Sequence, residues 1–292
     1  MLSASIKQIN ALFNKLDDKS EFEIMFNNYN NNNKQTIIKF MNVLNYAKWR
    51  SEKEKLKITN ETILDVIYNP EYNSSYRISI SGIDKINNIL NLVHQRQNHI
   101  ILSILSTQFY KTEGITFISK KLDKKNIVDN DQYDIRFRLS SEEDITKKDL
   151  DILSNIQYNE CDKITYRYKQ RVSLYLSEKD NIKLDLTFVK CSSNPNDLNQ
   201  TISSYEIEID YSPNIKKIND KVLDLLLNEV EKIKQVLEDT DEIITKDESN
   251  SIIAQYKKIS FGFENNTSTQ LYSMKPISAE VQHIVDKIPN KY

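Results

Sequence analysis

The sequence predicts an α+β protein in which an antiparallel sheet or barrel carries one charged face. Two short segments alternate carboxylates with apolar residues, Glu21–Ile24 and Tyr205–Tyr211. Two others alternate cations in the same way, Tyr133–Ser140 and Ile164–Leu176. Because successive side chains on a strand point to opposite faces, the charges of each segment share one face. Like charges on one face repel unless opposite charges lie among them, so we expect these segments to surround a polyanion site.

The composition limits how such a site could bind its ligand. The 292 residues carry a formal net charge of −2, which argues against binding nucleic acid through bulk charge. The chain has three glycines, and neither GxxxxGK(S/T) nor GxGxxG occurs, so a glycine-rich phosphate loop is excluded. We therefore expect phosphates to be bound by side chains, in one large domain or in one domain with an extension.

Cysteine usage and the apolar stretches predict a soluble protein of a reducing, intracellular compartment. Cys161 and Cys191 form no metal-ligand pattern, the three histidines are scattered, and we recognise no signal peptide. The longest apolar stretch, around Ile100–Leu105, is too short to span a membrane.

Helices and strands alternate along the first half of the chain. Apolar residues at helical spacing predict helices over Ser3–Leu16, Lys34–Trp49 and Gly82–Gln97. Ser3 is expected to cap the first helix, and Trp49 to anchor the second to the sheet. Strand patterns cover Glu21–Phe26, Lys57–Ser81 and Gly114–Leu122.

The second half continues with strands and ends in a long helix. Strands are predicted over Tyr133–Ser140, Lys163–Ser177, Asn181–Cys191 and Tyr205–Tyr211, with a hairpin turn at Glu178–Asn181. Helices are predicted over Thr146–Ile156, Ile215–Leu237 and Lys246–Ile259. Because periodicity weakens after Glu238, we place the main domain at residues 1–237 and an extension at residues 238–292.

The two acidic segments are candidates for a metal site. Carboxylates from two adjacent strands, Glu21 and Glu23 with Glu206 and Glu208, could form the all-oxygen site that Mg²⁺ or Mn²⁺ prefers. The alternative is half-exposed strands whose carboxylates are solvated or make ion pairs worth less than about 1 kcal/mol each. One such motif alone favours the alternative, but two beside paired basic strands favour the metal site.

The basic strands are candidates for binding phosphate. Arg167, Lys169 and Arg171 share one face, where arginine offers bidentate contacts and lysine a point charge. On the following strand, Lys183, Asp185 and Thr187 share a face, and Asp185 could orient a neighbouring arginine. The alternatives are a solvated positive face and a simple surface salt bridge.

A third alternating row, Arg136, Arg138, Ser140 and Glu142, ends in an acid that could orient or deprotonate water. The alternative places Glu142 in a loop or at the cap of the following helix, and Glu143 competes for the same role. Arg77 adds a cation on another alternating strand.

With these residues in order along the chain, the sequence resembles the tunnel-type, metal-dependent RNA 5′-triphosphatases, also called triphosphate tunnel metalloenzymes. It is most similar to the N-terminal domain of the mRNA capping enzymes of giant viruses. The resemblance covers roughly residues 18–237 and rests on four motifs, Glu21-Phe22-Glu23, Arg167-x-Lys169-x-Arg171, Lys183-x-Asp185-x-Thr187 and Glu206-Ile207-Glu208.

The resemblance implies a closed antiparallel barrel of about eight strands, with a hydrophilic interior and helices packed outside. It implies that Glu21, Glu23, Glu206 and Glu208 bind Mg²⁺ or Mn²⁺, and that Glu142 positions water. The phosphate-binding residues would be Arg77, Arg136, Arg167, Lys169 and Arg171, supported by Lys183, Asp185 and Thr187.

Three positions depart from the family pattern or stay open. Lys183 stands where many relatives have arginine, and Asp210 where some have a third glutamate. Lys120 and Lys121 compete for one phosphate-binding position, because adjacent strand residues face opposite sides.

The resemblance also implies the reaction and its setting. The expected activity removes the γ-phosphate of triphosphate-ended nascent mRNA, the first step of cap formation, with nucleoside triphosphates as further substrates. Guanylyltransferase and methyltransferase domains would follow residues 238–292 in the full-length polypeptide, in the viral factory of the host cytoplasm or in the virion. The alternatives are an inorganic tripolyphosphatase or another tunnel hydrolase, although these usually have lysine where Met25 stands, and a silent RNA- or partner-binding tunnel.

Overall fold

The computed structural model describes residues 5–26, 36–71, 73–94, 98–213 and 220–261. The chain divides into two compact units, Met1–Ile243 and Ile244–Tyr292. The N-cap expected at Ser3 lies outside the described residues. No helix in the described part of the chain combines the length and apolarity needed to cross a membrane.

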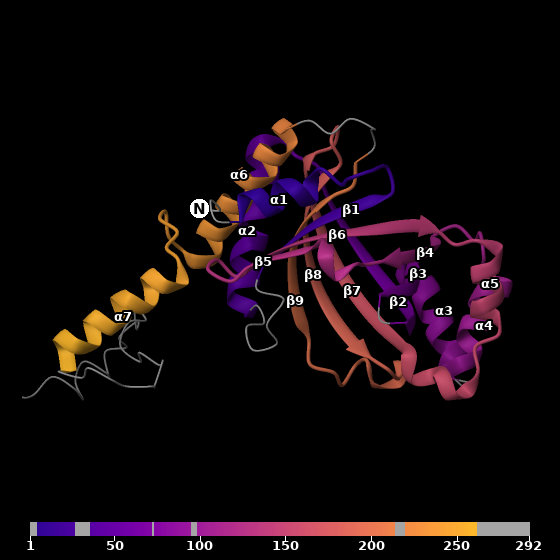
Figure 1. Cartoon of the computed structure of the whole chain (residues 1–292). Coiled ribbons are helices and arrows are strands. Elements are labelled where there is room, and N and C mark those ends of the chain that lie inside the picture. Colours follow the sequence, from indigo (N-terminus) through magenta and orange to yellow (C-terminus); the bar gives the residue numbers. More distant parts are fainter. Residues whose placement is uncertain (1–4, 27–35, 72, 95–97, 214–219, 262–292) are drawn as a thin grey trace, which may run out of the picture. The chain divides into compact units, whose positions relative to one another are not determined.

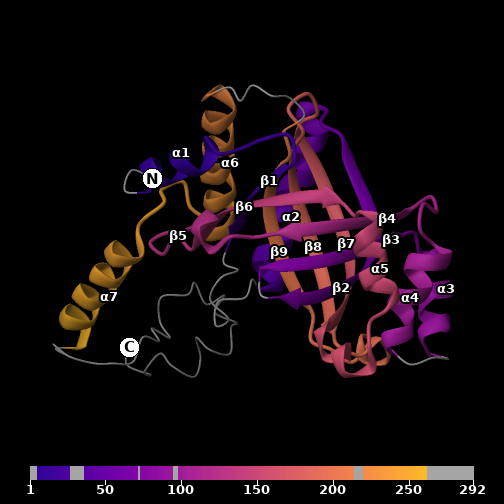
Figure 2. The same cartoon turned by 45° about the vertical axis from the view of Figure 1, so that its right-hand side comes forward.

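Eight strands of the first unit form a closed antiparallel barrel (Figures 1 and 2). Their order is β1-β9-β8-β7-β2-β3-β4-β6, and β6 pairs back onto β1 to close the ring. β5 extends the sheet by pairing with β6. The strands are β1 (Ser20–Phe26), β2 (Ile58–Glu71), β3 (Ser74–Ser81), β4 (Ile115–Lys121), β5 (Ile127–Asn130), β6 (Ile135–Asp144), β7 (Ile164–Ser177), β8 (Ile182–Ser192) and β9 (Ser204–Tyr211). The eight-stranded barrel implied by the resemblance is confirmed.

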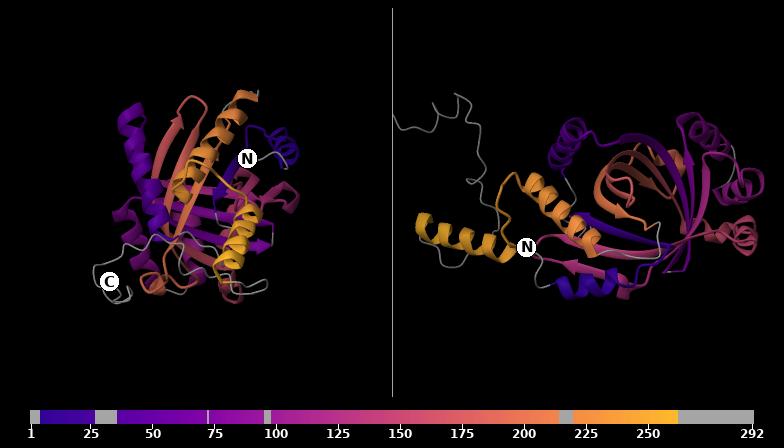
Figure 3. Two further views of the ribbon diagram at one scale, coloured as in Figure 1. Left: turned by 90° about the vertical axis from the view of Figure 1, so that its left-hand side faces the viewer. Right: turned by 90° about the horizontal axis from the view of Figure 1, so that it is seen from above.

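Helices cover the outside of the barrel (Figure 3). The helices of the first unit are α1 (Ile6–Phe13), α2 (Ile37–Glu54), α3 (Ile83–His94), α4 (Asn98–Gln108), α5 (Lys147–Ser154) and α6 (Asp220–Glu238), and the second unit has α7 (Lys246–Phe261). α1, α2 and α6 share a core with β1, β6, β8 and β9, whereas α3, α4 and α5 share another with β2, β3 and β4. Thr36 caps α2, and Thr146 and Asp149 form a capping box at α5.

Alternation along the strands separates an apolar outer face from a charged inner face. On β1, Phe22 and Ile24 are fully buried against the helices, and on β9 Ile207 and Ile209 are too. This burial of one face fixes the register, since a slip of one residue would turn every charge outward. The predicted strand faces are therefore those of the barrel.

Four local features differ from the sequence predictions. Trp49 is 50% exposed, stacks on Tyr46 and lies under the Lys53 ammonium, so it does not anchor α2 to the sheet. α4 was missed because its buried apolar run lacks a polar face, and β5 because it has only four residues. β6 extends beyond Ser140 to Asp144, so Glu142 lies on the strand and not in a loop.

Candidate active site

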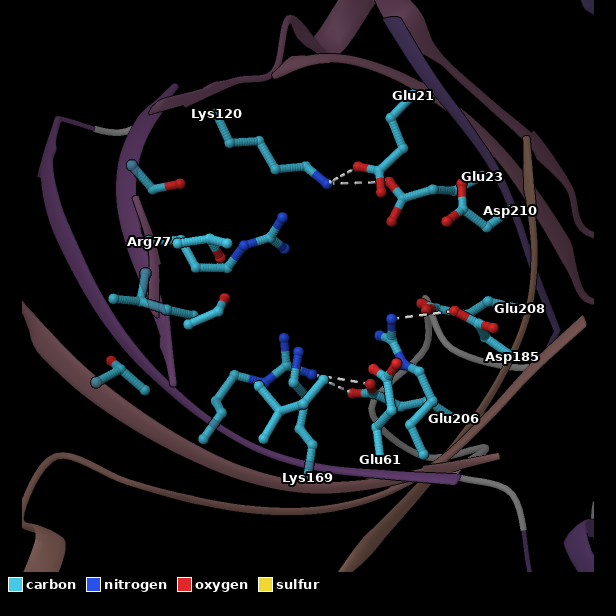
Figure 4. Close-up of a pocket in the computed structure, with 18 of the residues that line it drawn as sticks. Glu21, Glu23, Glu61, Arg77, Lys120, Lys169, Asp185, Glu206, Glu208 and Asp210 are labelled. Carbon is cyan, nitrogen blue, oxygen red and sulfur yellow. Dashed lines mark hydrogen bonds and ion pairs between the residues drawn. The ribbon is translucent and has the colours of Figure 1, made fainter. Parts of the chain in front are cut away.

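A cavity of about 530 Å³ lies inside the barrel, and every barrel strand contributes inward-facing residues to its lining (Figure 4). Glu61 and Asn69, near opposite ends of β2, both line the cavity and are both exposed. The cavity therefore reaches solvent at both ends of the barrel.

One wall of the cavity is acidic. It consists of Glu21 and Glu23 on β1 and Glu206, Glu208 and Asp210 on β9. The register places Glu23 beside Asp210, and Met25 beside Glu208. The four carboxylates expected to bind metal therefore face one space, and Asp210 faces it as well. Burial, and then repulsion from Glu23 and Glu206, raises the pKa of Glu208 above the usual carboxyl range.

Two cations reach into this acidic wall. The Lys120 ammonium contacts Glu21 and lies 3.4 Å from Glu23 Oε2 and 3.2 Å from Glu142 Oε1. Arg138 donates to Glu23 Oε2 at 2.6 Å. Burial alone would lower the pKa of Lys120, yet the three carboxylates outweigh it and raise that pKa. Lys120, not Lys121, thus faces the interior, which settles the choice that the sequence left open.

β7 supplies the opposite, basic wall, and each of its cations has an acidic partner. Arg167 donates to both oxygens of Glu206 at 2.7 and 2.8 Å. Lys169 Nζ lies 2.5 Å from Asp65 Oδ2, and burial lowers the pKa of Lys169 despite that carboxylate. Arg171 lies 3.0 Å from Asp185 Oδ2. The three predicted phosphate-binding residues therefore all line the cavity.

Arg77 connects the basic wall to Glu142. Its Nη2 lies 2.6 Å from Glu142 Oε1. Burial works to raise the pKa of Glu142, but Lys120 and Arg77 outweigh it and lower the pKa, so this carboxyl is ionised at neutral pH. Glu143 pairs instead with Lys19 at 2.9 Å, so Glu142 is the acid that contacts interior side chains, although it is not itself among the described residues that line the cavity.

Of the remaining predicted residues, one lines the cavity and the others lie beside it or outside it. Asp185 lines the cavity, Lys183 Nζ lies 3.6 Å from Asp210 Oδ2, and Thr187 accepts a hydrogen bond from Arg171 at 3.2 Å. Arg136 instead donates to Asp129 on β5 at 2.6 and 3.0 Å. It is not among the described residues that line the cavity.

Sequence reasoning did not assign roles to several inward-facing residues, Glu61, Asp65 and Arg138 among them. The signal for the first two was the alternation Glu61-x-Ile63-x-Asp65 within a strand that otherwise reads as apolar. Arg138 shares the inward face predicted for Arg136, and it is the member of that pair that lines the cavity.

Comparison with known proteins connects this geometry to a structural group. The chain is 26% identical over 276 residues, 94% of its length, to a "Probable mRNA-capping enzyme" of Acanthamoeba polyphaga mimivirus. The triclinic structure of the mimivirus capping enzyme triphosphatase superposes with a TM-score of 0.59 at 22% identity, covering 78% of this chain and 96% of that one. The chain has the fold of this triphosphatase.

A second solved structure agrees, that of the RNA triphosphatase domain of a trifunctional mimivirus mRNA capping enzyme. It gives a TM-score of 0.59 at 21% identity and covers 81% of this chain and 97% of that one. The resemblance to a giant-virus capping-enzyme triphosphatase is therefore confirmed. The match spans 22% of the length of the mimivirus capping enzyme, and no protein-family profile matches the chain.

The interior of this triphosphatase fold has the donor chemistry of a divalent-cation site. No three His, Cys, Asp or Glu side chains of the described residues are already arranged as a ligand set. Glu208 nevertheless lines one cavity with Glu23 and Glu206, and after burial, repulsion from these two carboxylates raises its pKa. Carboxylate oxygens are the hard ligands that Mg²⁺ and Mn²⁺ prefer, and a bound divalent cation would relieve the repulsion between them.

Proposed function

We propose that the chain is a metal-dependent RNA 5′-triphosphatase that removes the γ-phosphate from triphosphate-ended nascent mRNA and leaves a 5′-diphosphate. The observation that carries the proposal is the interior of the closed barrel, where the carboxylates of β1 and β9 face the cations of β3 and β7. The site accommodates a linear polyanion on one wall and a divalent cation on the other.

Glu21, Glu23, Glu206 and Glu208 would hold the divalent cation, Mg²⁺ or Mn²⁺. When bound, the cation supplies Lewis-acid stabilisation of charge on a γ-phosphate oxygen. Lys120 and Arg138 pair with Glu21 and Glu23, so the cation would share these two carboxylates with side chains of the site.

Arg77, Arg167 and Arg171 would bind the phosphate oxygens through bidentate donor pairs, and Lys169 through a point charge. Charge develops on the phosphoryl oxygens as the anhydride bond breaks, so cations fixed beforehand stabilise the transition state more than the ground state. Asp65 and Asp185 fix Lys169 and Arg171 in place.

Glu142 would align the attacking water. Its carboxylate is ionised and held by Arg77 and Lys120, so it can accept a hydrogen bond from a water molecule and direct that oxygen at the γ-phosphorus. Arg136, paired with Asp129, takes no part in phosphate binding in this scheme.

The proposed reaction is one step of a longer capping pathway. A 5′-diphosphate end is the acceptor on which a guanylyltransferase would build the cap, and a methyltransferase would complete it. The similarity to part of a longer mimivirus capping enzyme supports this setting for residues 1–237, with residues 238–292 leading to the next domain. A viral factory of the host cytoplasm, or the virion, is the compartment in which such an enzyme would act.

The test is release of γ-labelled phosphate from triphosphate-ended RNA, with and without Mg²⁺ or Mn²⁺. We expect metal-dependent release that the double variant Glu21→Ala/Glu206→Ala abolishes. Glu142→Ala should lower kcat by about 100-fold, whereas Glu143→Ala, on the adjacent outward-facing residue, should stay within about twofold. Metal-independent release, or none, would reject the proposal in favour of a silent binding tunnel.

A parallel comparison separates the tunnel hydrolases from one another. Initial rates on triphosphate-ended RNA, ATP and inorganic tripolyphosphate should rank RNA first in kcat/KM. A higher kcat/KM for tripolyphosphate than for RNA would make the chain an inorganic tripolyphosphatase.

A further inference from the structure

The charge of the inward-facing residues changes along the barrel axis. β2 runs from the end of the barrel where Glu61 faces inward to the end where Asn69 does, and we name the two ends after these residues. Neighbouring strands are antiparallel, so β7 runs in the same direction from Arg171 to Thr165, and β9 from Asp210 to Ser204. The inward-facing residues of each of these three strands form a row, and in each row charged side chains are followed by uncharged ones towards the Asn69 end.

Six strands end in an uncharged inward-facing residue at the Asn69 end. We call this set the collar: Met25, Asn69, Ser75, Thr165, Cys191 and Ser204. Met25, Asn69, Ser75 and Thr165 line the same cavity as the charged residues, and Ile67 lines it one step deeper, paired with Thr165 in register. The other two rows end in Arg136, paired with Asp129, and in Lys120, which reaches inward to Glu21.

Two arginines lie next to the collar, and beside them lie Glu206 and Glu23, two residues in from Ser204 and Met25. Arg167 and Arg77 each lie two residues from a collar member, Thr165 and Ser75. Glu21, Asp185 and Asp210 lie farther towards the Glu61 end of their strands. That end also exposes two inward-facing carboxylates, Glu61 and Asp144. Arg171 and Lys183 pair there with Asp185 and Asp210, which leaves Glu61 and Asp144 in excess. A polyanionic chain would therefore meet more negative charge at the Glu61 end than at the Asn69 end.

We propose that the collar binds the first nucleoside of the substrate, so that the RNA enters at the Asn69 end with its γ-phosphate leading. The inference rests on the proposed function and adds its orientation and its nucleoside subsite. Ile67 and Met25 offer apolar contact to the sugar and base, and Asn69, Ser75 and Thr165 offer hydrogen bonds to sugar hydroxyls. The α- and β-phosphates meet the arginines, and the γ-phosphate meets the acidic wall and its cation.

The test compares a ligand that carries a nucleoside with one that does not. The triple variant Asn69→Ala/Ser75→Ala/Thr165→Val removes the polar groups of three collar residues, and only the first substitution also removes appreciable volume. We expect the ratio of kcat/KM for triphosphate-ended RNA to that for inorganic tripolyphosphate to fall about tenfold, chiefly through KM for RNA. The matched control Ser81→Ala/Thr116→Val removes hydroxyls from the same cavity near the Glu61 end and should leave the ratio within about twofold.

The other outcomes would contradict the proposed orientation of the RNA in the barrel. An unchanged ratio in the collar variant would remove the subsite, and a selective loss in the control pair would place the nucleoside at the Glu61 end. Calorimetric dissociation constants for the same two ligands decide the question even if no phosphate is released, which separates failure of this inference from failure of the proposed activity. In the unaltered chain, RNA with 4-thiouridine as its first nucleotide should photocross-link to peptides containing Asn69 or Thr165, and cross-links at Glu61 or Ser81 would contradict the proposal.

Discussion

At the scale of single residues, each interior cation of the proposed site is matched by a carboxylate. Arg77 meets Glu142, Arg138 meets Glu23, Arg167 meets Glu206, Lys169 meets Asp65 and Arg171 meets Asp185. Pairing allows many charges to be buried inside a barrel that would otherwise be strongly destabilised. A triphosphate with its divalent cation would supply the opposite charge to both walls at once.

Asp65→Asn should destabilise the protein strongly, because Lys169 would keep a buried charge without its partner. Asp65 is fully buried and Lys169 is 5% exposed. We expect the free energy of unfolding at pH 7 to fall by about 3 kcal/mol, measured by urea denaturation. Asp129→Asn, which breaks the partly exposed pair with Arg136, should change it by less than about 1 kcal/mol. Equal losses in the two variants would contradict the prediction.

The same pair predicts the pH dependence of stability. Burial works to raise the pKa of Asp65, but Lys169 and Arg77 outweigh it and hold the pKa below 3.8. A carboxyl whose pKa is lower in the folded than in the unfolded state stabilises the fold above the unfolded value, and this is lost as pH falls. The gap in unfolding free energy between the native chain and Asp65→Asn should therefore be full above pH 3.8 and shrink below it. A gap that widened in acid would reverse the assignment.

At the scale of elements, a buried ion pair connects α2 with α6. Arg50 on α2 contacts Glu229 on α6, and the two side chains are 6% and 2% exposed. Glu54, one turn beyond Arg50, also pairs with it at 2.7 Å but is 40% exposed. The two acids therefore offer a buried and a surface partner for one guanidinium.

Glu229→Ala should weaken the packing of these helices far more than Glu54→Ala. Removing the buried partner leaves Arg50 inside the core with only an exposed counter-charge, which costs about 3 kcal/mol, against less than about 1 kcal/mol for the surface partner. The measurement is the midpoint of guanidinium unfolding, with unchanged slope as the control for two-state behaviour. Similar midpoints for the two variants would show that the buried pair contributes no more than the exposed one.

Elements also show how far the sequence could predict the site. A period of two, with charges on one face, was enough to place Glu23, Glu208 and Arg167 inside the barrel. It could not choose the partners, because pairing depends on the register between strands far apart in the chain. Lys120 is the example, since its neighbours Glu21 and Glu142 come from β1 and β6. Arg136 has the same alternation as the inward-facing residues, but it pairs with Asp129 on the neighbouring strand β5.

At the scale of the molecule, closure of the barrel joins residues from both ends of the first unit. β1 pairs on one side with β6 and on the other with β9, so both acidic motifs depend on one ring of strands. The buried apolar residues of the two cores extend from Ile9 to Leu237, and none of those in the described residues lies in the second unit. The core and the proposed site thus lie within Met1–Ile243.

Truncation after Ile243 should therefore leave the barrel folded and the proposed activity intact. We expect the thermal midpoint of the truncated chain to lie within about 2 °C of the full chain, because no core residue is lost and 1 kcal/mol would shift a domain of this size by about 2–4 °C. Phosphate release from triphosphate-ended RNA should stay within about twofold.

Truncation after Asp224 is the matched comparison, because it removes Leu226, Val230 and Ile233, which are fully buried on α6. Loss of folding in the chain that ends at Ile243 would mean that the second unit completes the barrel domain. Retention in both would mean that α6 adds little to its stability.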